Sequence, residues 1–74
     1  MPKLPVVSGT EVVRALKRAG FVVDRQRGSH VTLWHPGQRR AVTVPLHGED
    51  LPPGTLRSIL RQSGLSVEEF RKLL

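Results

Sequence analysis

The chain contains no cysteine in its 74 residues, so neither disulfide bonds nor thiolate metal sites can stabilise its fold. A domain of this length buries only roughly 60% of the surface that its unfolded chain exposes, which leaves room for one thin core. We therefore expect a single domain over residues 1–74 that depends on packing, with help from a partner. Catalysis by a cysteine nucleophile is excluded.

The charge of the chain points to a polyanionic partner. Twelve Lys and Arg against six Asp and Glu give a net charge of +6, and most of these cations are Arg. A net charge of this size creates a positive electrostatic field that concentrates polyanions near the protein surface. The guanidinium group of Arg suits bidentate contacts with phosphate. Nucleic acid is the first partner to consider. A basic surface that only confers solubility, or a coding bias toward Arg, is the alternative.

Nothing in the sequence indicates a membrane. The first residues lack the apolar stretch of a signal peptide, and no apolar run approaches the ~20 residues of a membrane-spanning helix. We expect a cytoplasmic protein that makes no contact with a membrane.

A first helix is predicted over residues 10–19. Ser8 and Glu11 have the spacing of a capping box, apolar residues then recur at helical intervals, and Gly20 provides the stop. The opposite face carries three cations that could lie against phosphates, although a solvated face is the commoner explanation: Arg14, Lys17 and Arg18.

Three antiparallel strands are predicted over residues 21–25, 29–34 and 40–44, with turns at Gly28 and Gly37. Alternation directs one set of residues toward the helices: Phe21, Val23, Val31, Leu33, Val42 and Val44. It leaves another set on an uncovered face: Val22, Asp24, His30, Thr32, Trp34, Ala41 and Thr43. His35 points inward at the edge of the sheet and is assigned no role.

A second helix is expected after Pro52 and Pro53, with Gly64 as its stop, and a capping box at Ser66 opens a short last helix. The order of helix, three-stranded antiparallel sheet, helix and short C-terminal helix predicts an α+β fold in which helices cover one face of the sheet.

His30 is the candidate catalytic residue. It follows Gly28 and Ser29, where the glycine leaves space for a phosphate or sugar. Cutting RNA without a metal requires a base that takes the 2′-hydroxyl proton, and histidine transfers protons near neutral pH. Ser29 could orient the phosphate or the imidazole, and Arg25 or Arg27 could stabilise charge on the phosphoryl oxygens. The alternative is a surface histidine with no role.

His47 lies in an exposed loop between Pro45 and Gly48. It could carry a second proton if both imidazoles faced one phosphate, but the sequence cannot place them together, and loop capping or a partner contact is the alternative. The three histidines have no ligand spacing and the acids are scattered, so we expect no metal. No nucleotide-binding motif occurs either, and no cofactor is expected.

Trp34 is the sole tryptophan, on the face predicted to be uncovered. One aromatic makes a weak platform for bases, so we favour a protein interface over base stacking. Packing across the edge of the sheet is the remaining alternative.

An ordered set of motifs covers nearly the whole chain: Ser8-Gly9, Gly20-Phe21, Arg27-Gly28-Ser29-His30, Val44-Pro45-Leu46-His47, Pro53-Gly54-Thr55-Leu56-Arg57-Ser58-Ile59-Leu60, Gly64-Leu65-Ser66 and Glu69-Phe70. In this set the chain resembles the HicA family of toxins from HicAB toxin–antitoxin modules. The resemblance implies a fold like a double-stranded RNA-binding domain, cleavage of messenger RNA independent of the ribosome, and catalysis by His30. His47 matches a commonly retained histidine to which no firm role is attached.

The same resemblance implies a HicB-type antitoxin as partner, with operator DNA reached only through that antitoxin. We expect the antitoxin to cover His30, Thr32 and Trp34 and to compete with RNA. The leading hypothesis is thus a metal-independent endoribonuclease toxin whose Arg14, Lys17, Arg18, Arg25 and Arg27 hold RNA. The alternatives are an RNA-binding module without catalysis and a degenerate toxin that only binds a partner.

Overall fold

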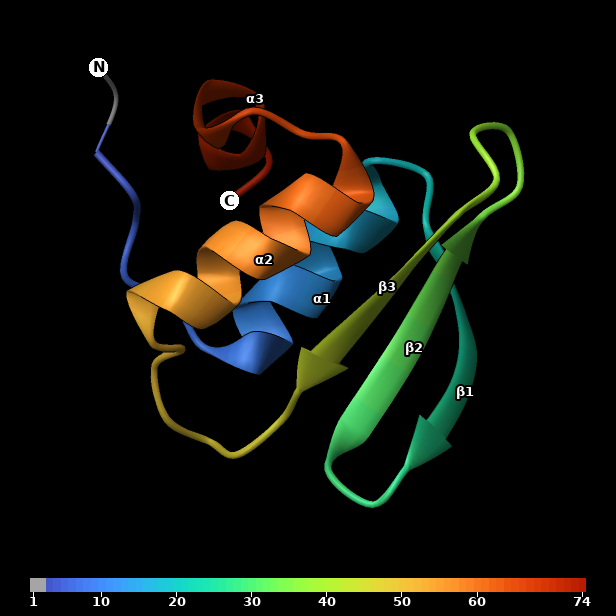
Figure 1. The fold of residues 1–74 in the computed structure, drawn as a ribbon, viewed down its shortest axis with the longest axis horizontal. Coiled ribbons are helices and arrows are strands. Elements are labelled where there is room, and N and C mark those ends of the chain that lie inside the picture. The colour runs from blue at the N-terminus through green and yellow to red at the C-terminus, as the bar shows by residue number, and fades with distance from the viewer. Residues whose placement is uncertain (1–2) are drawn as a thin grey trace.

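The helices and strands of the chain follow one another in the predicted order. The computed structural model describes residues 3–74 and contains α1 (Gly9–Arg18), β1 (Val22–Arg27), β2 (His30–His35), β3 (Arg40–Pro45), α2 (Pro53–Ser63) and α3 (Val67–Lys72) (Figure 1). This order confirms the α+β class and is consistent with a fold like a double-stranded RNA-binding domain.

Local signals at the helix ends determine where α1 and α3 begin. The backbone N–H of Ser8 donates to the Glu11 carboxylate over 3.0 Å, and that of Ser66 donates to Glu69 over 2.9 Å. In return each serine hydroxyl accepts a backbone N–H, so both predicted capping boxes are confirmed. The Ser66 backbone and hydroxyl hydrogen bonds lower the pKa of Glu69. Gly64 ends α2 in the left-handed conformation, with φ of 75°.

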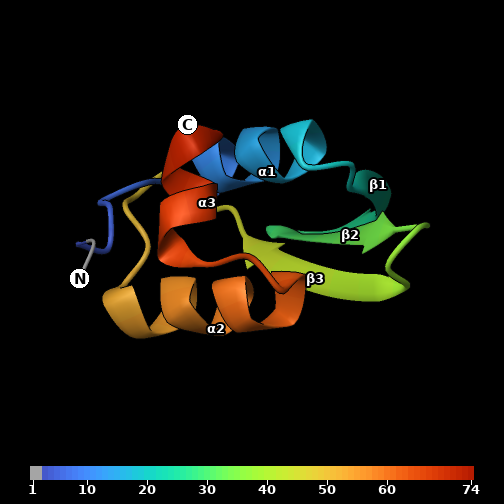
Figure 2. The ribbon, with the colours of Figure 1, turned by 90° about the horizontal axis from the view of Figure 1, so that it is seen from above.

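The helices gather on one side of the sheet and leave its other side open (Figures 1 and 2). The strands form an antiparallel meander in the order β1-β2-β3. Alternate residues of β2 and β3 face the helices and are buried, as predicted: Val31, Leu33, Val42 and Val44. Their neighbours along each strand are therefore left for the open face.

The core joins all three helices to the sheet. α1 and α2 lie against the sheet, and α3 lies beyond them (Figures 1 and 2). Fully buried side chains come from every layer, including Leu16 of α1, Leu33 of β2, Ile59 of α2 and Phe70 of α3. Within residues 3–74 we find no helix with the length and apolar character needed to span a membrane.

The prediction that Val23 belongs to the core is wrong. Val23 pairs with Leu33 and so faces the helix side, but β1 is an outer strand and Val23 is 45% exposed. All six residues of β1 are exposed. Of the two edge strands, β3 is covered by α2 whereas β1 extends past the cover of the helices, and alternation alone cannot reveal this difference.

A β-bulge changes the face that the second half of β1 presents. Val23 pairs with Leu33, but the next paired residue is Arg25, opposite Thr32, so Asp24 is the extra residue. Because strand residues alternate between faces, one extra residue transfers all that follow to the opposite face. The bulge therefore brings Arg25 and Arg27 to the face that carries Thr32 and His30.

His35 fastens α1 to the turn between β2 and β3. Its ring lies inward, as predicted, edge-on to Phe21 with 5.0 Å between the ring centroids. Nδ1 accepts the backbone N–H of Gln38 over 3.0 Å, so the ring proton belongs on Nε2, which lies 3.2 Å from the carbonyl oxygen of Ala19. His35 thus has a structural role that its position in the sequence did not indicate.

We expect His35→Ala to lower the free energy of unfolding by about 1–3 kcal/mol, because the variant lacks both a part-buried ring and its two hydrogen bonds. Urea unfolding followed by circular dichroism measures the change. Gln38→Ala is the matched control, since Gln38 donates through its backbone and keeps that bond. Equal stability of the two variants would contradict the structural role of His35.

Candidate functional site

His30 begins β2 directly after a two-residue turn formed by Gly28 and Ser29. Gly28 has φ of +55° and Ser29 does not have a positive φ, as in the hairpin turn that requires glycine at its first position. A Cβ on Gly28 would meet nothing within 4 Å. The glycine is therefore needed for the predicted turn, which presents Ser29 and His30.

Three rows of cross-strand neighbours cover the open face of the sheet. The strand register gives Arg27–His30–Pro45 as the first row, Arg25–Thr32–Thr43 as the second and Val22–Trp34–Ala41 as the third. We call these residues the open face. The register confirms that His30, Thr32 and Trp34 lie on the uncovered side.

The chemical character of the open face changes from one end to the other. At the β1–β2 turn, Arg27 lies beside the exposed His30. In the middle, the hydroxyl oxygens of Thr32 and Thr43 are 3.3 Å apart and share a hydrogen bond. The far row is apolar, and Trp34 there is 37% exposed. Anionic ligands are thus favoured at the His30 end and apolar partners at the Trp34 end.

The structure brings His47 to His30. The centroids of the two imidazole rings are 5.9 Å apart, and the planes are nearly perpendicular at 89°. Both residues are exposed. His47 also lines a hollow of ≈ 290 Å³ beside the first turn of α2, together with Glu49, Asp50 and Thr55. The open face and this hollow therefore meet at the histidine pair.

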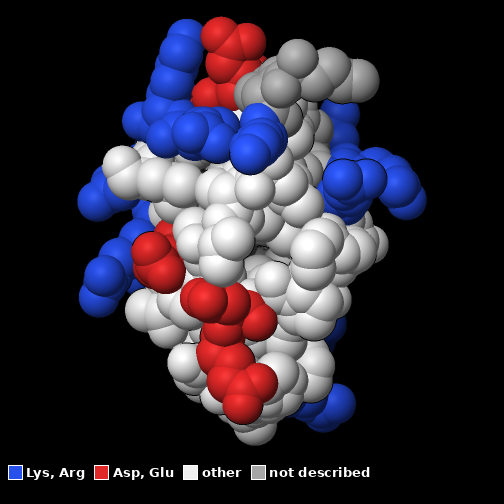
Figure 3. Space-filling view, turned by 90° about the vertical axis from the view of Figure 1, so that its left-hand side faces the viewer, with Lys and Arg blue, Asp and Glu red and all other residues white. Residues whose placement is uncertain are grey.

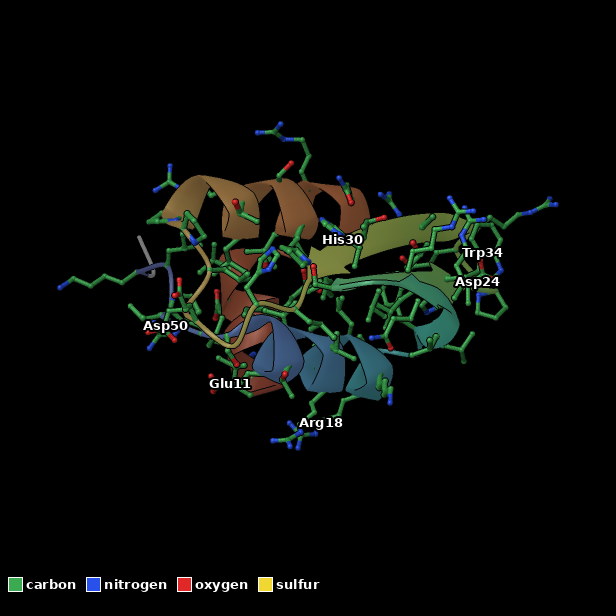
Figure 4. All side chains as sticks on the ribbon, turned by 90° about the horizontal axis from the view of Figure 1, so that it is seen from below. Glu11, Arg18, Asp24, His30, Trp34 and Asp50 are labelled. Atoms are coloured by element: carbon green, nitrogen blue, oxygen red, sulfur yellow. The ribbon has the colours of Figure 1, made fainter. Side chains whose placement is uncertain are left out.

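The cations of α1 are not brought to His30. Arg18 donates to the carbonyl oxygen of Leu73 next to α3, and with Arg14 and Glu11 it lines a separate hollow. Figure 4 shows Arg18 directed away from α1 on the side opposite the strands, whereas His30 lies among them. Lys17 is exposed on the same helix. The structure thus separates these cations from Arg25 and Arg27.

The distribution of charge favours the sheet as the surface for an anion. Residues 22–45, which form the strands and their turns, contain Arg25, Arg27, Arg39 and Arg40 against one acid, Asp24. The face turned away from the sheet shows Asp and Glu side chains in its lower half and at its upper edge, with Lys and Arg at the top and along both sides (Figure 3). Among residues 3–74, no three His, Asp or Glu side chains are grouped as metal ligands would be.

Gly9 is a residue whose importance only the structure reveals. A Cβ at this first position of α1 would overlap the carbonyl oxygen of Pro45 and come within 3.0 Å of Leu46 Cδ2. The glycine therefore lets the loop that carries His47 pack against α1. Its signal in the sequence is slight: a glycine inside a helix start, where alanine has the better helix propensity.

Comparison with protein-family models matches residues 9–65 to the HicA toxin of bacterial toxin–antitoxin systems. The match covers His30 and His47, the three strands and all of α2. A search of curated protein sequences finds none that matches the chain.

Proposed function

Since the chain belongs to the HicA toxin family of bacterial toxin–antitoxin systems, we propose that it is an endoribonuclease that cleaves messenger RNA by proton transfer at His30. The observation that carries the proposal is the exposed His30 ring beside Arg27 on the open face. The ring is reachable by a large substrate, and its cross-strand neighbour on β1 is an arginine, whose guanidinium group binds phosphate. The proposal needs no metal.

In the proposed reaction the 2′-oxygen of the RNA attacks the adjacent phosphorus and the bond from phosphorus to the 5′-oxygen breaks. His30 takes the 2′-hydroxyl proton or supplies the proton that the 5′-oxygen acquires. Arg27 and Arg25 balance the charge that develops on the non-bridging oxygens. The products are a 2′,3′-cyclic phosphate and a 5′-hydroxyl end.

Digestion of a labelled RNA by the intact chain in excess EDTA tests this function. We expect cleavage without added metal, with cyclic phosphate and 5′-hydroxyl ends on the fragments. Binding of RNA without cleavage would favour the non-catalytic RNA-binding module. A chain that neither cuts RNA nor arrests growth when expressed alone would favour a degenerate toxin that only binds a partner.

The placement of the cations predicts which of them hold RNA. Arg25→Ala combined with Arg27→Ala is expected to weaken RNA binding and to reduce the dependence of log K on log salt by about 0.7 for each phosphate that the variant no longer neutralises. Binding is measured by fluorescence anisotropy over a salt series. Arg14→Ala combined with Lys17→Ala removes the same charge from α1 and should change the slope less. An equal effect of both pairs would contradict the assignment of RNA to the open face.

We further propose that a HicB-type antitoxin covers the open face and so competes with RNA. The apolar row Val22–Trp34–Ala41, one end of the face that also holds His30, is the support for this proposal. Trp34→Ala should weaken toxin–antitoxin binding by at least about tenfold, because tryptophan is a frequent anchor of interfaces. Val6→Ala is the control, since Val6 is 77% exposed in the N-terminal segment. Unchanged affinity of the Trp34 variant in calorimetry would contradict this interface.

A further inference from the structure

The pair formed by His30 and His47 is built by two segments that are distant in the sequence. His30 belongs to β2, and His47 follows β3 in the loop that leads to α2. The two exposed rings meet edge to face, with 5.9 Å between their centroids. Two proton carriers thus lie at one end of a cationic sheet face, close enough to reach one phosphodiester together.

The backbone holds His47 in this position on both sides. The N–H of Leu46 donates to the carbonyl oxygen of Ser29, the residue before His30. Farther along, the N–H of Leu51 donates to the carbonyl oxygen of Val7 over 2.8 Å. Gly9 adds the close approach of α1 to Pro45. Since the loop is fastened before and after His47, the pairing of the rings is a built feature of the fold.

We propose that His47 is the second proton-transfer residue of the reaction. This assignment rests on the proposed function and adds a further catalytic residue to it. In an in-line displacement the attacking 2′-oxygen and the departing 5′-oxygen lie on opposite sides of phosphorus. One neutral imidazole takes the proton from the 2′-hydroxyl as the O–P bond forms. The other, as imidazolium, gives its proton to the 5′-oxygen as the P–O bond breaks. Protons and charge balance within the pair, without metal or cofactor.

The surroundings of the pair suit a phosphodiester strand that crosses it. Arg27 of β1 lies beside His30, whereas Glu49 and Asp50 are the charged residues that line the hollow beside His47. A phosphate is therefore favoured on the side of the sheet, and the hollow offers space for a neighbouring nucleoside. Thr55, in the first turn of α2, lines the same hollow.

The pH profile of His47→Gln tests the proposal. Glutamine keeps hydrogen-bonding groups but transfers no proton, so we expect kcat/KM in EDTA to fall by about 10²–10⁴. The intact chain should show a bell-shaped pH profile of kcat/KM, and the profile of His47→Gln should lack one limb. The RNA affinity of the variant should differ from that of the intact chain by less than about threefold. Glu68→Gln, an exposed substitution on α3, is the control and should keep both the rate and the bell shape.

Imidazole rescue separates chemistry from folding. Added imidazole should restore part of the activity of His47→Ala. It should leave the activity of Glu68→Gln unchanged, because that variant has lost no imidazole group. A His47→Gln variant that keeps full activity, or one that is slow but retains both limbs, would overturn the second proton-transfer role. Failure of the intact chain to cut RNA in EDTA would instead overturn the proposed function itself.

Discussion

Replacing His30 by alanine is expected to abolish RNA cleavage and leave the folded protein intact. General acid–base catalysis by one side chain contributes about 10²–10⁴ in rate, and kcat/KM should fall by at least this factor. The ring is exposed and its aromatic neighbour is the equally exposed His47, so the substitution removes little packing. We expect the free energy of unfolding to change by less than about 0.5 kcal/mol.

The measurement combines cleavage in EDTA, urea unfolding and RNA binding for the intact chain and His30→Ala purified in parallel. His35→Ala is the matched control, because it removes a histidine that braces the fold and lies outside the pair. We expect the His35 variant to lose stability and to cut RNA when folded, which is the reverse of the His30 variant. Cleavage of RNA by His30→Ala at the rate of the intact chain would refute a catalytic role for His30.

Gly9→Ala is expected to cost both stability and activity, although helix propensity alone predicts the opposite. Alanine is favoured over glycine by up to about 1 kcal/mol inside a helix. Here the added Cβ would overlap the Pro45 carbonyl oxygen, and relief requires the backbone of the His47 loop to move. Overpacking of this kind costs about 1–3 kcal/mol. The displaced loop should also separate His47 from His30 and lower kcat/KM.

Gly54→Ala provides the control for this substitution. Gly54 also lies in the first turn of a helix, but a Cβ there would meet nothing within 4 Å. We expect Gly54→Ala to be neutral or slightly stabilising and to keep full activity. Urea unfolding and kcat/KM of the two variants separate propensity from the steric effect. Equal behaviour would show that the approach of Pro45 to α1 does not constrain residue 9.

Much of the fold follows from signals that act over a few residues. The hydroxyls of Ser8 and Ser66 reach backbone groups three residues away, and Gly64 adopts the conformation that ends a helix. Alternation along β2 and β3 likewise predicts which residues are buried. These interactions are local, so residue type and spacing suffice to predict them.

The arrangement of the candidate site depended on the tertiary structure. The bulge at Asp24 directs Arg25 and Arg27 toward the face of His30, and hydrogen bonds with β2 determine that register. The meeting of His47 with His30 depends on Leu46 binding to Ser29 and on the space beside Gly9. By itself the sequence determined the elements, because caps and periodicity are short-range, and its resemblance to a known family singled out His30 as the candidate catalytic residue. Which side chains join His30 was decided by contacts between segments far apart in the chain, which only the assembled fold brings together.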